Sequence, residues 1–238
     1  MIQLDNLNKR FGNRMAVENL SLEIKAGTLY GLLGHNGAGK STTIGMMLGQ
    51  VMPDSGRVLL AGHDVQKNRA DALANVGAIF ETPSFYSYLS GRRNLEIFCS
   101  YSREVSAREM TEAIDLVGLG KRIDDPVRVY SHGMRQRLAL AQALLPRPKI
   151  LILDEPSEGL DPEGIYEMRE LIRNLHQRYQ LTILICSHLL AEVEQICREV
   201  AVMRQGKLLF HGDWKAASGA PSLESFYLQT VRADREKR

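Results

Sequence analysis

Two hydrophobic patterns follow each other in the N-terminal part of the chain. Ile2–Leu7 and Ala16–Ile24 alternate apolar and polar residues, with an interruption at Phe11-Gly12-Asn13, which predicts a small antiparallel sheet with a hairpin turn. Thr28–Leu33 is a short apolar run of the kind found in buried strands. A glycine-rich loop and a helical pattern over Ser41–Leu48 come next. The predicted order is therefore strand, glycine loop, helix.

Helical periodicity fills the middle of the chain. It runs over Ser90–Leu145, after a predicted strand at Val76–Phe80, and three serines mark helix starts near Ser90, Ser106 and Ser131. Serine is a preferred residue at the N-cap of a helix, because its hydroxyl accepts a hydrogen bond from a free backbone N–H. We therefore expect an inserted helical lobe here.

Strands and helices alternate after the lobe. In order, the predicted elements are Ile150–Leu153, Pro162–Arg178, Thr182–Cys186, Leu189–Ile196 and Val200–Met203. This βαβ alternation implies a parallel sheet, so the predicted fold class is α/β with a core that the lobe splits in two. A last short helix is expected at Glu224–Val231, and the closing charge run 232–238 is expected to fray in solvent.

Composition limits the classes of protein that fit these elements. The 238 residues carry 30 Lys+Arg against 28 Asp+Glu, a net charge of +2, which gives no sign of a surface built for a polyanion. No apolar stretch approaches the roughly 18 residues of a membrane-spanning helix, and the N-terminus lacks the pattern of a secretory signal. The 3 cysteines show no metal-type spacing. We expect a globular, cytosolic chain with reduced structural cysteines.

The strongest motif is a phosphate-binding loop. Gly34-His35-Asn36-Gly37-Ala38-Gly39-Lys40-Ser41 fits G-x-x-x-x-G-K-[ST] and lies between a predicted buried strand and a helix. The glycines let backbone N–H groups turn toward phosphates, and the helix N-terminus adds positive potential. Lys40 can bridge phosphates while the Ser41 hydroxyl ligates Mg²⁺.

Two carboxylates end the strand Ile150–Leu153. Asp154 and Glu155 are placed at the carboxyl edge of the sheet, beside the phosphate loop. Neighbouring residues at a strand end point in different directions, so Asp154 can hold the water shell of a metal while Glu155 orients or deprotonates a water. Alone, such a pair is more often a helix cap or a solvated pair, but its place after four aliphatic residues favours the catalytic interpretation.

Two further features point to phosphate. His188 follows the strand Thr182–Cys186 and so reaches the same edge of the sheet, where an imidazole can contact a γ-phosphate. Ser131 is a natural N-cap for the amphipathic helix after Tyr130, which gives the chain a second helix start suited to phosphate.

These motifs, in this order, resemble the nucleotide-binding subunit of ABC transporters over essentially the whole chain. The resemblance implies a P-loop NTPase core with a parallel sheet, a small N-terminal antiparallel sheet and an inserted helical subdomain. It places all of 1–238 in one ABC ATPase domain, with core 1–81 and 149–215, helical subdomain 82–148 and C-terminal extension 216–238. It also implies a head-to-tail dimer that sandwiches two ATP molecules.

The resemblance implies a role for each motif residue. Phe11 stacks on adenine, Glu155 is the general base, His188 is the switch histidine, and 157–161 is a loop that crosses the dimer interface. The residues implied for nucleotide binding are Phe11, Gly34, His35, Asn36, Gly37, Ala38, Gly39, Lys40, Ser41, Thr42, Glu81, Ser131, Gly133, Asp154 and Asp161, with Ser41, Glu81 and Asp154 also implied for Mg²⁺.

The chain departs from the family pattern at two motifs. The family signature Leu-Ser-Gly-Gly-Gln keeps its serine, Ser131, and its second glycine, Gly133, but Tyr130, His132 and Met134 replace the other three residues. Most relatives have glutamine where this chain has Glu81. A carboxylate can still ligate Mg²⁺ but adds charge and loses an amide donor.

A narrower resemblance rests on these departures. Glu81, the aromatic pair Phe85-Tyr86 and the altered signature are similar to ATPases of bacitracin-resistance and lantibiotic self-protection exporters. Phe85 and Tyr86 follow the loop that meets the membrane subunit in this family. Either they form part of a groove for a cytoplasmic coupling helix, or they pack at the joint between core and lobe.

The predicted function is an ATPase subunit that powers an exporter through separate integral membrane subunits. It is expected at the inner face of the cell membrane, paired with a second ATP-binding subunit as a homodimer, and without a nucleic-acid partner. The alternative is a soluble ABC ATPase that acts on nucleic acid or ribosomes. A third class, a P-loop kinase for a small molecule, leaves the signature and His188 unexplained. The sequence does not name the cargo.

Overall fold

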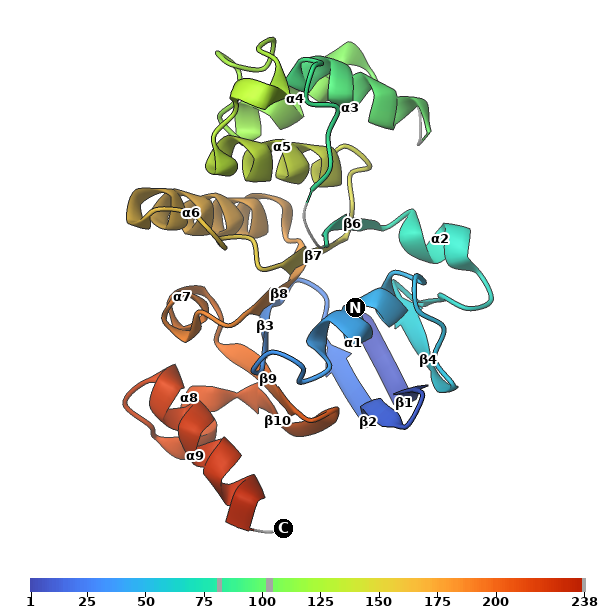
Figure 1. The fold of residues 1–238 in the computed structure, drawn as a ribbon, viewed down its shortest axis with the longest axis vertical. Coiled ribbons are helices and arrows are strands. Elements are labelled where there is room, and N and C mark those ends of the chain that lie inside the picture. The colour runs from blue at the N-terminus through green and yellow to red at the C-terminus, as the bar shows by residue number, and fades with distance from the viewer. Residues whose placement is uncertain (81–82, 102–104, 237–238) are drawn as a thin grey trace.

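The computed structural model describes residues 1–80, 83–101 and 105–236 and builds them around two sheets (Figure 1). In the first sheet the strands follow the order β2-β1-β4-β5, with all neighbours antiparallel. These strands are β1 (Ile2–Phe11), β2 (Arg14–Ile24), β4 (Ser55–Leu60) and β5 (His63–Asp64). The predicted antiparallel N-terminal sheet is confirmed.

The second sheet has the strand order β10-β9-β3-β8-β7-β6. All neighbours are parallel except β9 and β10, which form an antiparallel pair. The strands are β3 (Leu29–Leu33), β6 (Val76–Ile79), β7 (Ile150–Asp154), β8 (Thr182–Ser187), β9 (Glu199–Arg204) and β10 (Lys207–Asp213). The α/β class is confirmed, although β10 was not predicted.

Helices cover the second sheet and form the lobe. Near the core lie α1 (Lys40–Met47), α2 (Arg69–Leu73), α6 (Pro162–Tyr179) and α7 (Leu190–Ile196). Figure 1 shows the lobe at one end of the molecule and the C-terminal helices at the other. The lobe holds α3 (Gly91–Ser100), α4 (Ala107–Leu116), the 3₁₀ helix η1 (Val127–Val129) and α5 (His132–Leu144), and the other end holds α8 (Trp214–Ser218) and α9 (Leu223–Glu236).

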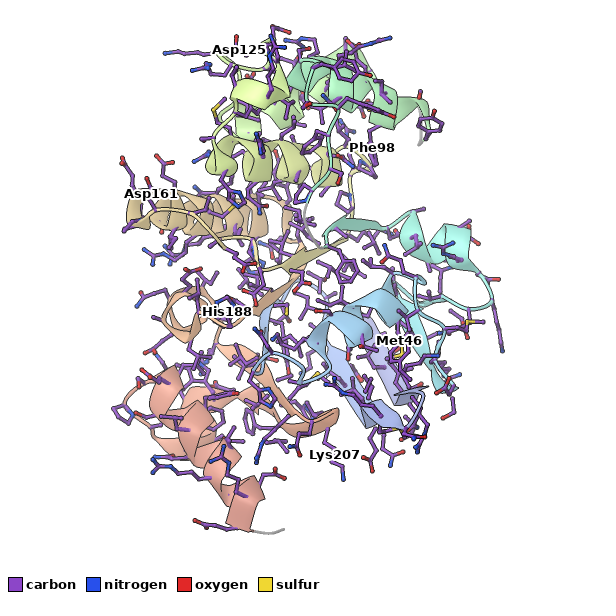
Figure 2. All side chains as sticks on the ribbon, viewed as in Figure 1. Met46, Phe98, Asp125, Asp161, His188 and Lys207 are labelled. Atoms are coloured by element: carbon purple, nitrogen blue, oxygen red, sulfur yellow. The ribbon has the colours of Figure 1, made fainter. Side chains whose placement is uncertain are left out.

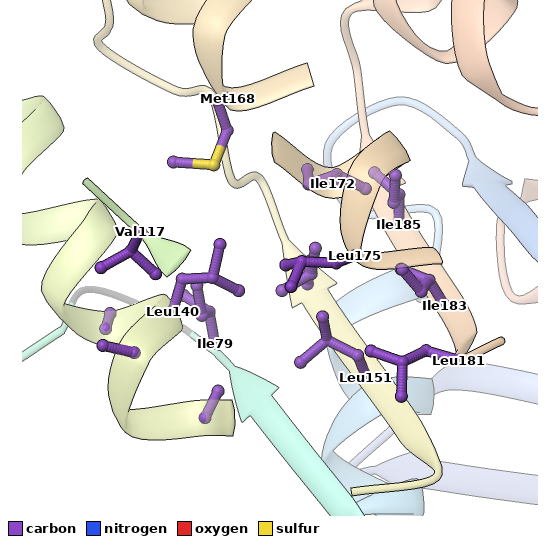
Figure 3. Close-up of a cluster of buried hydrophobic side chains, with 14 of the residues drawn as sticks. Ile79, Val117, Leu140, Leu151, Met168, Ile172, Leu175, Leu181, Ile183 and Ile185 are labelled. Atoms are coloured by element: carbon purple, nitrogen blue, oxygen red, sulfur yellow. The ribbon is translucent and has the colours of Figure 1, made fainter. Parts of the chain in front are cut away.

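The parallel sheet is buried on both faces, which explains its continuous apolar runs. Along β7, Leu151 and Leu153 face the apolar cluster that includes α6 and the lobe, while Ile150 and Ile152 face the cluster that includes α1 and the antiparallel sheet. Figure 3 shows the first cluster, in which Leu140 of α5 and Ile172 of α6 gather with the strand residues. The lobe therefore shares a continuous apolar core with the sheet.

A close backbone approach fixes α5 against the sheet. A Cβ atom on Gly77 of β6 would lie 2.1 Å from the carbonyl oxygen of Ala143 in α5, far inside van der Waals contact. A larger residue at Gly77 would push the helix away from the strand. The lobe is thereby held close to the sheet edge.

The C-terminal charge run differs from the prediction. Helix α9 continues to Glu236 instead of fraying, because Arg204 at the end of β9 reaches it. The Arg204 guanidinium donates to the Asp234 carboxylate at 2.7 Å and to the Val231 carbonyl at 3.2 Å. Both side chains are largely buried, so the ion pair ties the helix end to the sheet.

In the described residues, no helix combines the length and the apolar character needed to cross a membrane.

Candidate active site

The phosphate loop joins the end of β3 to the start of α1, as predicted. Gly37 and Gly39 have positive φ angles of 79° and 107°, a backbone region that favours glycine. A Cβ on Gly39 would lie 2.5 Å from the Ala16 carbonyl oxygen, so glycine is required there on spatial grounds as well. No side chain among the described residues caps α1. The first-turn N–H groups of α1 are therefore available to an anion.

Lys40 lies inside the curl of this loop. Its side chain is 7% exposed, and its ammonium donates to the Gly34 carbonyl at 2.6 Å, with the His35 carbonyl at 3.5 Å. The charge is held by backbone oxygens at the base of the loop. A phosphate bound by the loop would meet this ammonium directly.

A hollow of about 470 Å³ opens in front of the loop. It is lined by Phe11, Arg14, Ala16, Asn36, Gly37, Ala38, Gly39, Lys40, Ser41 and Thr42, so the structure brings Phe11 together with the loop residues named from the sequence. The Phe11 ring is 52% exposed and carries the Lys9 ammonium 5.3 Å from its centroid. An exposed aromatic face at the rim of an anion-binding hollow suits a nucleotide base.

The strand β7 ends in the two predicted carboxylates. Glu155 has a φ of 48°, rare for a residue other than glycine, and its N–H donates to the Cys186 carbonyl at 2.8 Å. Strained backbone of this kind is often found at functional sites. The two carboxylates have different partners: Asp154 is hydrogen-bonded to the Cys186 thiol, and Glu155 contacts the His188 ring.

Glu155 and His188 meet across the ends of β7 and β8. The ring Nδ1 of His188 lies 2.9 Å from Glu155 Oε2, and the His188 backbone N–H donates to the same oxygen at 3.3 Å. Strand β8 lies between β3 and β7, so His188, which follows it, stands between the phosphate loop and the carboxylates (Figure 2). The predicted base and switch histidine thus form one hydrogen-bonded pair.

Asp154 is a partly buried carboxylate. Burial raises its pKa, while the Cys186 thiol, which donates to it, and the nearby Lys40 ammonium act in the opposite direction. Burial and the Asp154 charge in turn raise the pKa of the Cys186 thiol. A cysteine expected to be purely structural therefore contacts the carboxylate of the site.

Glu192, near the start of α7, was missed by the sequence analysis. Burial raises its pKa, a hydrogen bond from Ser157 lowers it, and the charges of Arg169, Glu155 and His188 also act on it. Glu192 therefore connects the loop after Glu155 with the helix after His188. No local motif marks it, because the contacts arise from tertiary packing.

The signature residues lie in a second hollow, of about 510 Å³. It is lined by Ser131, His132, Gly133, Met134, Arg137, Gly159, Leu160, Asp161, Glu163, Gly164, Glu167 and Met168, none of which lines the first hollow. Ser131 Oγ accepts from the Met134 N–H at 3.2 Å, and Asp161 Oδ1 accepts from the Gly164 N–H at 2.8 Å. Within the described chain, Ser131, Gly133 and Asp161 are not brought to the phosphate loop.

Two of the unusual signature residues have visible packing partners. Tyr130 is 4% exposed, and its hydroxyl donates to the Arg122 carbonyl at 2.8 Å, which ties the start of α5 to the segment that follows α4 within the lobe. A Cβ on Gly159 would lie 3.4 Å from His132 Nε2, so the His132 ring lies beside the loop 157–161. Tyr130 and His132 of the altered signature therefore both pack against neighbouring parts of the chain.

The predicted membrane-facing residues take different environments. Phe85 packs against the apolar cluster of the lobe, whereas Tyr86 is 53% exposed and meets Tyr88 edge-on at 6.1 Å between ring centroids. Phe85 therefore packs where the lobe meets the core, and Tyr86 presents an aromatic ring to solvent. Glu81 lies outside the described residues.

Comparisons with known proteins identify the family of this chain. Residues 17–158 match the family model described as ABC transporter. The bacitracin transport ATP-binding protein BcrA of Bacillus licheniformis is 43% identical over 88% of this chain and 68% of its own length. The lantibiotic transport ATP-binding protein SrtF of Streptococcus pyogenes is 35% identical over 100% of both chains.

A solved structure agrees as well. The ATP binding subunit of an ABC transporter superposes with a TM-score of 0.85 and 26% identity, over 97% of this chain and 99% of that one. These likenesses do not support the alternative of an ATPase that acts on nucleic acid or ribosomes. The chain belongs to the ABC transporter family, as an ATP-binding subunit whose activity is the hydrolysis of ATP.

Proposed function

We propose that this chain powers an exporter by hydrolysing ATP at Glu155, with separate membrane subunits providing the path for the cargo. The observation that carries this proposal is the Glu155–His188 pair, 2.9 Å between Nδ1 and Oε2, at the strand ends beside the phosphate loop. A carboxylate held by a histidine at the site of phosphate binding has the arrangement of a general base.

The nucleotide is bound along the first hollow. Phe11 stacks on adenine, the backbone of residues 34–42 cradles the phosphates, and Lys40 bridges them. The uncapped start of α1 and the buried ammonium at Gly34 support this placement.

Mg²⁺ suits the oxygen donors offered by the phosphate loop and by the end of β7. It favours hard oxygen ligands and keeps several waters and substrate phosphates in its shell, so it needs few protein ligands. Ser41 and Asp154 supply a hydroxyl and a carboxylate, and Glu81 is proposed as a third donor. When bound, the ion would neutralise charge that develops on the phosphates.

Glu155 acts on the attacking water. In the described part of the chain, both contacts of its carboxylate with His188 use Oε2, so Oε1 is proposed to accept the proton of a water. His188 orients the carboxylate and places its ring at the edge of the sheet that faces the phosphates. The Glu155 carboxyl holds the proton while the bond between the γ-phosphate and ADP breaks.

A second copy of the chain completes each site. Ser131, Gly133 and Asp161 line a hollow separate from the phosphate loop, so they are proposed to contact the nucleotide of the partner in a head-to-tail homodimer. A serine-capped helix start suits a phosphate brought to it in this way. Two ATP molecules would then lie between two chains.

Residues 1–238 act as one ATPase domain in this proposal. The core is 1–81 and 149–215, the helical subdomain is 82–148, and 216–238 is a C-terminal extension. Tyr86 docks a membrane subunit, and this contact holds the chain at the inner face of the cell membrane. The exposed Tyr86–Tyr88 pair supports this contact.

Peptide antibiotics are the proposed class of cargo. Two relatives of this chain are named for bacitracin transport and lantibiotic transport. ATPase stimulation by bacitracin in a complex with the co-purifying membrane protein would support this assignment, and an ATPase that responds to no peptide would oppose it.

The hydrolysis proposal is tested with purified protein. Phosphate release from Mg·ATP is measured for the wild type and for Glu155→Gln, which keeps the side-chain shape but is a poor proton acceptor. The wild type should turn over ATP, and the variant should bind ATP without releasing phosphate. A variant that turns over normally would show that another residue is the base.

A further inference from the structure

We infer that Arg14 is a second nucleotide-binding cation, which holds the phosphate nearest the ribose. This inference deepens the proposed function and rests on it, because it assumes that Phe11 and Lys40 mark the two ends of a bound nucleotide. The sequence motifs do not include Arg14. Its assignment comes from its place in the folded hollow.

Arg14 reaches the phosphate loop from the antiparallel sheet. It opens β2 and is the direct cross-strand neighbour of Phe11 in the β1–β2 hairpin. Its Nη2 donates to the Gly37 carbonyl at 3.0 Å, and a Cβ on Gly37 would lie 3.0 Å from the same nitrogen. The guanidinium therefore lies directly on the middle of the loop.

The order of groups along the hollow gives the position of the contact. Phe11 marks the base end, and Lys40 marks the opposite end, where its ammonium is held at Gly34. Arg14 contacts the loop at Gly37 and starts beside Phe11, so it lies on the base side of Lys40. A phosphate at that point is the one attached to the ribose, which ATP and ADP share.

The charge of the hollow favours this role. Among its described lining residues, Arg14 and Lys40 are the cationic side chains, and none is a carboxylate. Arginine presents five N–H donors in a planar fork that matches phosphate oxygens, and the Gly37 carbonyl takes only Nη2. A bound phosphate can therefore use the remaining donors or replace the carbonyl.

Equilibrium titration with ATP and with ADP tests the inference, using wild type, Arg14→Ala, Arg14→Gln and Arg14→Lys. Arg14→Ala should weaken ATP and ADP equally, by about tenfold, and Arg14→Lys should recover part of the loss. The loss should shrink at high salt, because the guanidinium is exposed. In hydrolysis assays the lost contact should appear as a KM for ATP raised by about tenfold, in step with the loss of affinity.

The control is Arg10→Ala, which removes the same charge from β1 at a residue outside the hollow and should leave both affinities unchanged. Equal affinities in wild type and Arg14→Ala would overturn the inference, as would a loss confined to ATP. A fall in kcat and melting temperature with unchanged affinity, in both Arg14→Ala and Arg14→Gln, would assign Arg14 as a brace for the loop. Failure of the wild type to bind ATP would instead overturn the proposed function itself.

Discussion

The helices that begin at the two hollows differ in how their N-termini are capped. At the phosphate loop, α1 starts at Gly39, and no described side chain caps it. At the signature, α5 and α6 are capped by the residues implied for nucleotide contact, Ser131 and Asp161. The first hollow thus presents unsatisfied backbone donors, whereas the second already satisfies one donor of each helix itself.

The two hollows also differ in charge: the first is lined by cationic side chains, and the second is lined mainly by acidic ones. Arg14 and Lys40 line the first, while the second is lined by Asp161, Glu163 and Glu167, and its Arg137 already donates to Glu167 at 2.7 Å. A polyanion is attracted to the first hollow and repelled by carboxylates in the second. The second hollow is therefore suited to close on a nucleotide that is already bound by another chain, and not to capture one itself.

The largest expected effect is on the rate of ATP hydrolysis, with little change in the affinity of the first hollow for ATP. Glu155→Gln should slow hydrolysis by about 10²-fold or more, because the amide cannot take the proton of water, while ATP affinity stays within about threefold. Phosphate release and equilibrium binding measure the two quantities. Glu23→Gln, an exposed carboxylate on β2, is the control and should change neither.

The second effect concerns capture of ATP. Lys40→Ala should lower ATP affinity by about 10- to 100-fold, as expected for loss of a charge-assisted contact. Lys25→Ala, at an exposed lysine, should leave affinity intact. If Lys40→Ala bound ATP as tightly as the wild type, the first hollow would not be the capture site.

A third, smaller effect tests the second hollow. Ser131→Ala should reduce hydrolysis by about tenfold and leave ATP binding to the dilute chain unchanged, because its contact is with the nucleotide of another chain. Removal of an N-cap also costs about 1 kcal/mol of stability. Ser106→Ala removes the matched cap of α4 in the same lobe and should cost similar stability without the loss of activity. If Ser131→Ala and Ser106→Ala lost equal activity, Ser131 would act only as the N-cap of α5.

The smallest effect is at the rim of the first hollow. Phe11→Ala should lower ATP affinity by about fivefold, because one face of a half-exposed ring is lost, and Phe11→Tyr should keep it. Binding of inorganic triphosphate, which has no base, should be the same in all three proteins. A loss for triphosphate too would mean that Phe11 supports the loop and does not stack on the base.

Most of the fold follows from local patterns in the sequence. The runs that form β3, β7 and β8 are apolar because both sheet faces are buried, and Ser90, Ser106 and Ser131 are N-caps as predicted. Strand β10 was missed, because KLLFHGD is only half-buried and shows no clear alternation. The last helix was predicted, but its continuation to Glu236 was not, because the Arg204 that holds Asp234 lies 30 residues away in sequence.

In the candidate site, too, residues in local motifs could be predicted from the sequence, and residues that meet through tertiary contacts could not. The phosphate loop, Asp154 and Glu155 are contiguous motifs whose chemistry depends on neighbouring residues. Arg14, by contrast, meets Gly37 from another sheet, and no spacing rule encodes that meeting. Residues that act through tertiary contacts become visible only in the folded chain.

The central claim is that the two hollows are halves of one site, joined between two copies of the chain. Sedimentation of Glu155→Gln with saturating ATP tests it most directly. We expect a species of twice the chain mass with ATP, a single-chain species with ADP, and a single-chain species with bound ATP when Ser131→Arg is added. If the Glu155→Gln chain stayed single with ATP bound, or paired equally well with Ser131→Arg, the two hollows would not be halves of one shared site.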